Sequence, residues 1–577
     1  MLQRLIDYAH LHIPLSEPGF TVRGIRWRID IDGDGKLLGI IPSVNDKGDE
    51  RWGCPEMHEM NSGGKSHFLI DNLKTAIRLD ADDKNEPRHA FYVARVREAA
   101  ESIPSLRPLQ HFLEDDSQLI ALSATMAAAP HKAGPNDNVQ WRIDGRDPLA
   151  DPAVVEWWRQ WRKNDLGADP PSNADMVCFG TGAMAPPMET QPKVMRLPGG
   201  QGSGDALIGF DKAAFTSFGL KKSTNAAISE PAARQYVDAL NHLVRHRSKK
   251  LADSLALHWF KGEVTDQDDV LAWLNDPPEV AAASAAIAAR RLFDAIRSGQ
   301  RPDLGNAEFY ALTLSGMSGR VMVRDWMEGR FEQLVDHIAA WFADLAITAR
   351  DGQSLARDPK FMAVCGALVR DLKDFPAPTS TTLWKVAVQR LPIPQPLMAL
   401  AVARFRTDLV DKDQPPFNHA RMGLIKAYFI RRTPGGDTHM TTGYNPNHPA
   451  AAYHCGGLLA VLASLQRAAI GEVGAGVVQR FYAAASQTPG LVVGRLVGNA
   501  RNHLTKLDPK LAWWYEERIA ELMIRFGDAV PRILDLDGQA LFALGYYQKL
   551  AELRAGNKTQ ALAQPLTETL AAQGDLL

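Results

Sequence analysis

Cysteine is scarce in this chain, and its four copies lie far apart. Cys54, Cys178, Cys365 and Cys455 form no C-x-x-C pair among the 577 residues, and no histidine stands at ligand spacing from them. The pattern argues against both a disulfide framework and a structural zinc site. It is typical of proteins in a reducing compartment, so we expect a cytoplasmic protein.

Long apolar runs and targeting signals are also missing. No stretch of 18 apolar residues occurs, so we expect neither a membrane-spanning helix nor a membrane partner. The first residues, "MLQRLIDYAHLH", lack the apolar core of a signal peptide. The formal net charge is only −2, so any surface that binds nucleic acid has to be local.

Catalytic motifs are a third absence. The sequence contains no G-x-S-x-G, no H-E-x-x-H and no pair of carboxylates at a spacing typical of nucleases. Asp30, Asp32 and Asp34 begin like a calcium loop, but its twelfth position is Ile41 instead of a bidentate Glu. We therefore expect no catalytic residue, no metal and no cofactor. A binding or scaffold protein is favoured, and a stand-alone nuclease or ATPase is the alternative.

A glycine-rich stretch, "NSGGKSHFLIDN" at 61–72, ends like a nucleotide-binding P-loop. The P-loop needs a glycine five residues before Gly64, where this chain has Glu59, and no apolar strand precedes the stretch. ATP binding is therefore not expected here. Lys65 and Ser66 on a Gly-Gly pair still suit a phosphate, including one in a nucleic-acid backbone. The simpler interpretation is a solvated loop.

Hydrophobic periodicity predicts a mixed N-terminal part. Apolar residues alternate with polar ones from Ile25 to Ile31, which indicates a half-buried strand, and the following "DGDG" turn predicts a hairpin with "KLLGIIPS". Arg26 and Arg28 then share the wet face, as two cations about one nucleotide step apart or as plain solubilising residues. Residues 88–127 have helical spacing, 130–152 are typical of a loop, and 175–230 indicate short strands and turns.

The chain becomes mostly helical after Pro231, with a strand-like interruption at 308–326. The Pro- and Gly-rich segment 431–449 indicates a linker, and 450–555 predicts four to five amphipathic helices. We therefore predict an α+β protein: a mixed region with short antiparallel sheets at 1–230, a mainly helical middle region at 231–430, and a C-terminal helical bundle at 440–577. Few contacts are expected to cross the linker, so the bundle should fold by itself.

Positive charge is concentrated locally despite the neutral total. Residues 212–261 hold nine Lys or Arg against three Asp or Glu, and residues 467–510 hold six against two. A charge run of this kind is usually a solvated helix face. It is also what a phosphate-binding face looks like when the rest of the chain compensates the charge.

Three blocks carry a resemblance. They are "VCFGTGAMAPP" with "GGQGSGDALIGFDKAAFTSFGLKKSTNAAISEPAARQYVDALNHLV", then "YALTLSGMSGRVMVRDW", then "GGLLAVLASLQRAAIG" through "RFYAAASQTPGLVVGRLVGNARNHLTKL" to "GQALFALGYYQKL". In this order, and with "GIRWRIDIDGDG" near the start, they resemble the large subunit of the type I-C CRISPR surveillance complex, Cascade, over nearly the whole chain. Relatives tend to carry a His where this chain reads "PKVMRLPGGQG" and an Asn where it has Gly316-Met317, so contacts by those side chains do not transfer.

The resemblance implies a non-catalytic subunit that recognises the protospacer-adjacent motif on double-stranded target DNA. It also implies that the subunit helps to hold the guide CRISPR RNA and the displaced DNA strand. The implied protein partners are the Cascade backbone and guide-processing subunits and the helicase-nuclease that degrades the target. A pure RNA-binding scaffold is a further alternative.

Candidate site residues follow from the resemblance and the charge pattern together. The N-terminal region reads the motif in the family, so the DNA-binding candidates there are Lys65, Ser66, Asn72, Lys74, Arg26 and Arg28. The Asn72 amide suits a base edge, or else it satisfies its own turn. The candidates for contacts with the nucleic-acid backbone are Lys221, Lys222, Arg467, Arg480, Arg495, Arg501 and Lys506.

Overall fold

The computed structural model describes the chain except for residues 14–16, 46–47, 58–63, 129, 169–174, 189, 211, 217–218, 221, 279–283, 410–417, 433–434, 472–475, 527–529 and 572–577. It divides into two compact units. The first comprises Met1–Arg196, Gly200–His246 and Met317–Val321, and the second comprises Leu197–Gly199, Arg247–Gly316 and Met322–Leu577. Short sheets and helices occur in both units, and the C-terminal half is helical, so the α+β prediction is confirmed.

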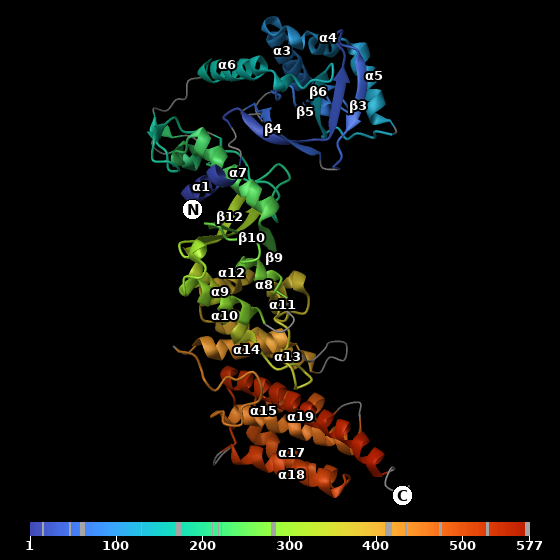
Figure 1. Ribbon diagram of the computed structural model, residues 1–577, viewed down its shortest axis with the longest axis vertical. Helices are drawn as coiled ribbons and strands as arrows, with labels where there is room; N and C mark the ends of the chain where they lie inside the picture. The colour runs from blue at the N-terminus through green and yellow to red at the C-terminus, as the bar shows by residue number, and fades with distance from the viewer. Residues whose placement is uncertain are drawn as a thin grey trace. The chain divides into compact units, whose positions relative to one another are not determined.

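The first unit combines small sheets with surrounding helices (Figure 1). Its strands are β1 (Phe20–Ile25), β2 (Trp27–Ile31), β3 (Leu37–Pro42), β4 (Asp49–Pro55), β5 (Asp71–Asn72), β6 (Asn138–Ile143), β7 (Met176–Val177) and β8 (Met184–Ala185). Its helices are α1 (Leu2–His12), α2 (Leu73–Ala76), α3 (Glu86–Ser102), α4 (Arg107–Glu114), α5 (Asp116–Ala127), α6 (Pro152–Ala168) and α7 (Glu230–His246).

The main sheet of this unit has the strand order β3-β2-β6-β5. Strand β2 buries Trp27, Ile29 and Ile31 and pairs antiparallel with β3, which confirms the predicted strand and hairpin. The loop predicted for 130–152 is wrong, because β6 lies inside it and runs parallel to β2 with Trp141 opposite Ile29. Turn-forming residues flank β6 closely in sequence, and a parallel partner distant in the chain leaves no local signal.

A buried hydrogen-bond chain connects this sheet to α3. Trp141 Nε1 donates to the Tyr92 hydroxyl at 2.8 Å, and that hydroxyl donates to the Leu69 carbonyl at 2.9 Å. All three residues are almost fully buried, so each polar atom needs its partner. These two hydrogen bonds fix the segment before β5 against the core of the unit. That segment belongs to the glycine-rich stretch.

The second unit joins one sheet to a long series of helices (Figure 1). Its strands are β9 (Ser248–Leu251), β10 (Ser254–Lys261), β11 (Glu308–Met317) and β12 (Arg320–Arg330). Its helices are α8 (Val270–Asn275), α9 (Ala285–Arg297), α10 (Phe331–Leu345), α11 (Phe361–Gly366), α12 (Ala377–Gln389), α13 (Gln395–Asp408), α14 (His419–Arg432), α15 (Ala451–Ile470), α16 (Val477–Ala485), α17 (Pro489–Leu504), α18 (Pro509–Ile524) and α19 (Leu536–Ala571).

The sheet of the second unit has the order β12-β11-β10-β9. Strands β11 and β12 confirm the predicted strand at 308–326. The expectation of mainly helix after Pro231 missed β9 and β10. Strand β10 is buried at nearly every position and pairs with β11, with Leu257 opposite Leu312. Because β10 is buried on both faces, its sequence lacks the apolar and polar alternation that distinguishes a strand from a helix.

Helices α15 to α19 form the predicted bundle after the linker, so the predicted helix series is confirmed. Helix α15 is buried along most of its length and packs on α19. Two glycines permit the contact: a Cβ at Gly456 would lie 2.0 Å from the Phe542 carbonyl oxygen, and one at Gly545 would lie 2.0 Å from the Tyr453 carbonyl oxygen. The two backbones therefore touch at reciprocal positions.

The segment predicted as a linker is hydrogen-bonded to this bundle. Gln548 on α19 donates to the Thr441 carbonyl at 2.8 Å and accepts from the Tyr453 hydroxyl at 2.6 Å. Contacts also cross the segment, because Phe405 on α13 packs against the rings of Tyr482 and Tyr546 at 5.6 and 6.3 Å. One continuous apolar core therefore extends through the second unit.

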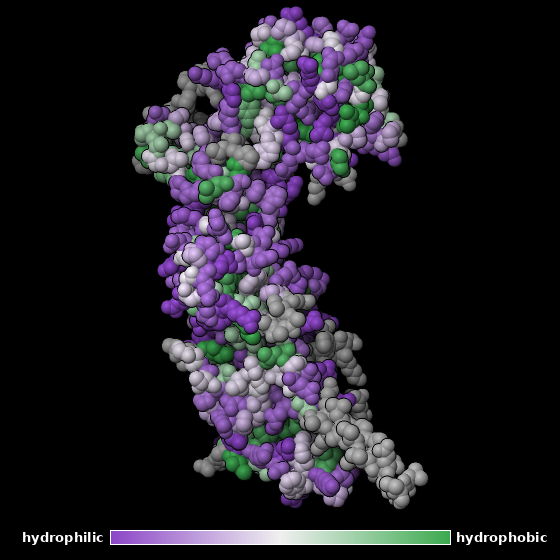
Figure 2. All heavy atoms as spheres, viewed as in Figure 1, coloured by the Kyte–Doolittle hydropathy of each residue, from purple (hydrophilic) through white to green (hydrophobic). Residues whose placement is uncertain are grey.

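Hydrophilic residues cover most of the visible face of each unit, and apolar residues form separate patches (Figure 2). Across the described part of the chain, every helix is too short or too polar to cross a lipid bilayer. All four cysteines are buried free thiols.

Candidate nucleic-acid interface

The end of the glycine-rich stretch is fixed between two helices of the first unit. Gly64 adopts a φ of +75°, and a Cβ there would lie 2.7 Å from Pro87 Cβ on α3, so only glycine fits. Lys65 Nζ lies 3.5 Å from Asp165 Oδ2 on α6. Glu59 and Gly63, which belong to the P-loop comparison, lie outside the described residues.

The two predicted phosphate ligands of this stretch differ in access. The Lys65 side chain keeps 28% of its surface exposed, so its ammonium group can exchange Asp165 for an incoming phosphate. Ser66 is fully buried, and its hydroxyl has no hydrogen-bond partner among the described residues. The Ser66 hydroxyl is therefore not accessible to a ligand in this conformation, whereas the Lys65 ammonium group is partly accessible.

Asn72 has a clear local role at the start of α2. Its Oδ1 accepts from the Thr75 backbone N–H at 3.1 Å, which caps the helix, and its Nδ2 donates to Asp71 Oδ1 at 2.9 Å. One amide hydrogen and one lone pair remain for another partner. Lys74 follows in the first turn of α2 and is half-buried.

Asp71 and His67 support this loop from inside. Asp71 accepts from the backbone N–H groups of His67 and Asn72 at 2.8 and 2.7 Å, and burial raises its pKa. His67 Nδ1 accepts from the Met57 N–H at 3.1 Å, and burial, followed by nearby Arg23, holds the pKa of His67 well below its usual value. A neutral His67 fits that position, because a second cation beside Arg23 would be repelled.

Arg26 and Arg28 both contact the segment that follows β3. Arg28 forms an ion pair with Asp49 at 3.1 Å, and Arg26 donates to the Asn45 carbonyl at 2.9 Å. Arg26 lies between β1 and β2, outside both strands. Arg26 therefore holds the connection between β3 and β4, and Arg28 holds the start of β4.

Aromatic residues beside Lys65 form a stack that the sequence analysis did not identify. The rings of Phe68, Trp158 and Trp161 stack in turn with centroids 5.5 and 5.3 Å apart. The Arg95 guanidinium lies 4.8 Å from the Trp161 ring, and Trp161 is one helical turn before Asp165. The sequence signal is the "EWWRQWRKND" run on α6, but its partners on other elements are not visible in it.

The predicted backbone contacts in the first unit are only partly described. Lys221 lies outside the described residues. Lys222 is exposed and adopts a left-handed φ of +48° in a short 3-10 segment, Lys222–Ala226. Lys222 therefore lies at a turn on the surface.

The C-terminal candidates gather on α15, α16 and α17. The members are all exposed: Arg467 in the last turn of α15, Arg480 on α16, Arg495 and Arg501 on α17, and Lys506 just after α17. Arg480, Arg495, Arg501 and Lys506, here called the bundle cations, form no ion pair with any described residue. The guanidinium of Arg495 lies 5.0 Å from the Phe481 ring.

The bundle cations differ from Lys65 and Arg28 in their ion pairs. Lys65 and Arg28 each have a carboxylate partner, whereas the bundle cations are exposed and have none among the described residues. An unpaired cation contributes its full charge to a polyanion and releases a counterion when it binds. Among the described residues, no group of three or more His, Cys, Asp or Glu is arranged to hold a metal ion.

The chain matches a known protein family. The family model described as CRISPR-associated protein (Cas_Csd1) matches residues 3–554 of the chain. No curated protein matches the chain.

Proposed function

The chain belongs to the Cas_Csd1 family of CRISPR-associated proteins, and from this we propose that it is the large subunit of a type I-C Cascade complex. In this role it recognises the protospacer-adjacent motif on duplex DNA, helps to hold guide RNA and the displaced DNA strand, and helps to recruit the helicase-nuclease. The subunit itself is non-catalytic. The family match over residues 3–554 is the observation that carries the proposal.

The N-terminal loop supports a role in motif recognition. Lys65 is a partly exposed cation whose only described ion pair is with a single carboxylate at 3.5 Å, so an incoming phosphate can compete with Asp165 for it. The aromatic stack and the Asp71 contacts hold the loop rigid from behind. Guide RNA pairing reads most of the target sequence, so a few contacts from such a loop are enough for the motif.

The bundle cations support contact with a single strand. They face water on and beside helices whose other sides pack into the core, so a strand can approach them without displacing a carboxylate. Charge complementarity of this kind also raises the rate of association with a polyanion.

Reconstitution of the complex tests the proposal. The assembled complex is expected to bind motif-bearing duplex DNA more tightly than DNA with a scrambled motif. Lys65→Ala should weaken binding to both and leave assembly intact, whereas Arg97→Ala, an exposed cation paired with Glu114, should change neither. Equal binding of both DNAs by the parent complex would overturn motif recognition. Hydrolysis of ATP or DNA by the isolated subunit, abolished by Lys65→Ala, would favour an enzyme instead.

A further inference from the structure

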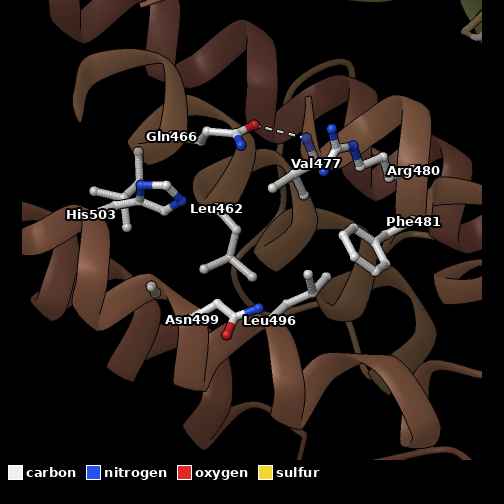
Figure 3. Close-up of a pocket in the computed structure, with 10 residues that line it drawn as sticks. Leu462, Gln466, Val477, Arg480, Phe481, Leu496, Asn499 and His503 are labelled. Atoms are coloured by element: carbon white, nitrogen blue, oxygen red, sulfur yellow. Dashed lines mark hydrogen bonds between the residues drawn. The ribbon is translucent and has the colours of Figure 1, made fainter. Parts of the chain in front are cut away.

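A pocket of about 200 Å³ opens between α15, α16 and α17 (Figure 3). Its apolar lining includes Leu462 and Leu465 from α15, Phe481 from α16 and Leu496 from α17. The volume is room for several water molecules and is below the roughly 300–1,000 Å³ of pockets for drug-sized ligands. The pocket therefore suits a single flat ring system.

Polar groups converge on the same space. His503 and Phe481 face each other across the pocket, and the amides of Gln466 and Asn499 lie on the other two sides (Figure 3). Gln466 Oε1 accepts from the Val477 N–H at 2.7 Å, which fixes the side chain and leaves its amide nitrogen without a partner among the described residues. Asn499 forms no side-chain hydrogen bond with a described residue.

His503 completes the set of unused hydrogen-bonding groups. Its Nδ1 is buried and has no hydrogen-bond partner in the described part of the chain. Burial, followed by the nearby Lys506, lowers the pKa of His503, so the ring is neutral near neutral pH and offers one donor and one acceptor. A buried ring nitrogen without a partner costs free energy that a ligand recovers.

The charge around the pocket indicates what kind of molecule carries the ring. No carboxylate is among its described lining residues, and Arg480 forms part of its wall. Arg495 lies on α17, and its guanidinium is 5.0 Å from the ring of Phe481, which lines the pocket. A free neutral ligand would not need these cations, whereas a base attached to phosphates on both sides would use them.

We propose that this pocket receives one unstacked base of a single-stranded nucleic acid while Arg480 and Arg495 contact the flanking phosphates. The inference rests on the proposed single-strand contact of the bundle and adds a base-sized subsite to it. Gln466 and Asn499 pair with the base edge, and Phe481 contacts the ring. Because carboxamides can donate and accept, the site takes more than one kind of base.

Two tryptophan variants on α17 test the subsite in the full-length protein. Asn499→Trp fills the pocket, and Asn502→Trp places the same side chain three residues further on, at another exposed position outside the lining. Affinity is measured by fluorescence anisotropy with a labelled mixed-sequence single strand, as DNA and as RNA, and with a strand that has abasic positions. His503→Leu serves as a second variant that keeps the apolar fit and removes both ring nitrogens.

Asn499→Trp and His503→Leu are expected to bind the base-containing strand roughly tenfold more weakly than Asn502→Trp, which is the effect of removing about one stacked base. All variants should bind the abasic strand alike. Equal affinity of the variants for the base-containing strand, with normal salt-dependent binding, would overturn the pocket and leave the proposed function standing. Failure of every protein to bind either strand would overturn both. A loss of affinity seen with DNA alone or RNA alone identifies which strand the pocket takes.

Discussion

At the residue scale, Lys426 is an ammonium group held out of water. The residue is 2% exposed on α14, and its Nζ donates to the Ala343 carbonyl at 3.4 Å. Burial lowers the pKa of Lys426 to about 8, against the opposing effect of Asp344. The unfolded chain keeps this proton up to about pH 10.5, so between these two pH values the unfolded state binds more protons. The free energy of unfolding therefore rises with pH across that window through this group.

Lys426→Met is expected to remove this rise and to leave stability at neutral pH unchanged or higher. Methionine fills a similar volume, and an apolar side chain has no charge to desolvate. Thermal melting of both proteins from neutral pH to above pH 8 measures the effect. Lys373→Met, at a side chain that is 77% exposed, is the control and should follow the parent. Parallel curves for Lys426→Met and the parent would contradict the prediction.

Asn72 combines a cap with a predicted base contact, and two substitutions separate these roles. Asn72→Ala loses the hydrogen bond to the Thr75 N–H and should cost about 1 kcal/mol of stability. Asn72→Ser keeps a capping oxygen and should be nearly as stable as the parent. If the amide reads a base, both variants lose discrimination between motif-bearing and scrambled DNA in the assembled complex. Full discrimination by Asn72→Ser would leave Asn72 as a cap alone.

At the scale of elements, the α15–α19 contact depends on its glycines. Gly456→Ala and Gly545→Ala each place a Cβ 2.0 Å from a backbone oxygen, so the helices must separate. We expect each to cost at least about 1–3 kcal/mol, as overpacking does. Gly494→Ala on α17 is the matched control, because a Cβ there meets nothing within 4 Å and should stabilise the helix by about 0.5–1 kcal/mol. Equal melting temperatures for Gly456→Ala and Gly494→Ala would show that the close approach is absent in solution.

Elements with a local pattern were predictable, and elements defined by distant partners were not. The β2–β3 hairpin and helices α15 to α19 follow from alternation, turn residues and helical spacing. Strand β6 depends on a parallel partner far earlier in the chain, and β10 is buried on both faces. At the candidate site Lys65 was visible in the sequence, but its ion pair with Asp165 joins segments that only the tertiary fold brings together.

At the scale of the whole molecule, the net charge of −2 conceals the unpaired face of the bundle. Replacing the four bundle cations by alanine should reduce the salt dependence of single-strand binding by roughly 0.7 for each phosphate that is no longer neutralised. The measurement is the slope of log affinity against log salt for the full-length protein. Replacing Arg297 and Arg390, which are exposed but paired with Glu332 and Asp336, is the control and should leave the slope unchanged. An unchanged slope in the four-alanine variant would show that the bundle cations do not contact the phosphates of the single-stranded nucleic acid.

Residues 440–577 are predicted to fold by themselves, but their apolar core continues into the rest of the second unit. Helix α13 contributes Phe405 to the rings of the bundle, and Arg406 donates to Gln539 on α19 at 2.6 Å. The fragment 440–577 is expected to be helical but to melt at a lower temperature than the fragment 395–577, because it exposes this surface to water. Circular dichroism melting compares the two. Equal melting temperatures would show that α13 and α14 add no stability to the bundle. An unfolded fragment 440–577 would contradict the prediction that the bundle folds by itself.

The positions of α15 and α19 in the chain also set an order of events during synthesis. Helix α15 leaves the ribosome first, and α16, α17 and α18 follow before α19 exists. Until then the face of α15 around Gly456 has no partner helix, and a contact between segments so far apart in the chain forms slowly. Emergence of α19 from the ribosome is therefore the step that closes the bundle, and a ribosome stalled before α19 carries an open one.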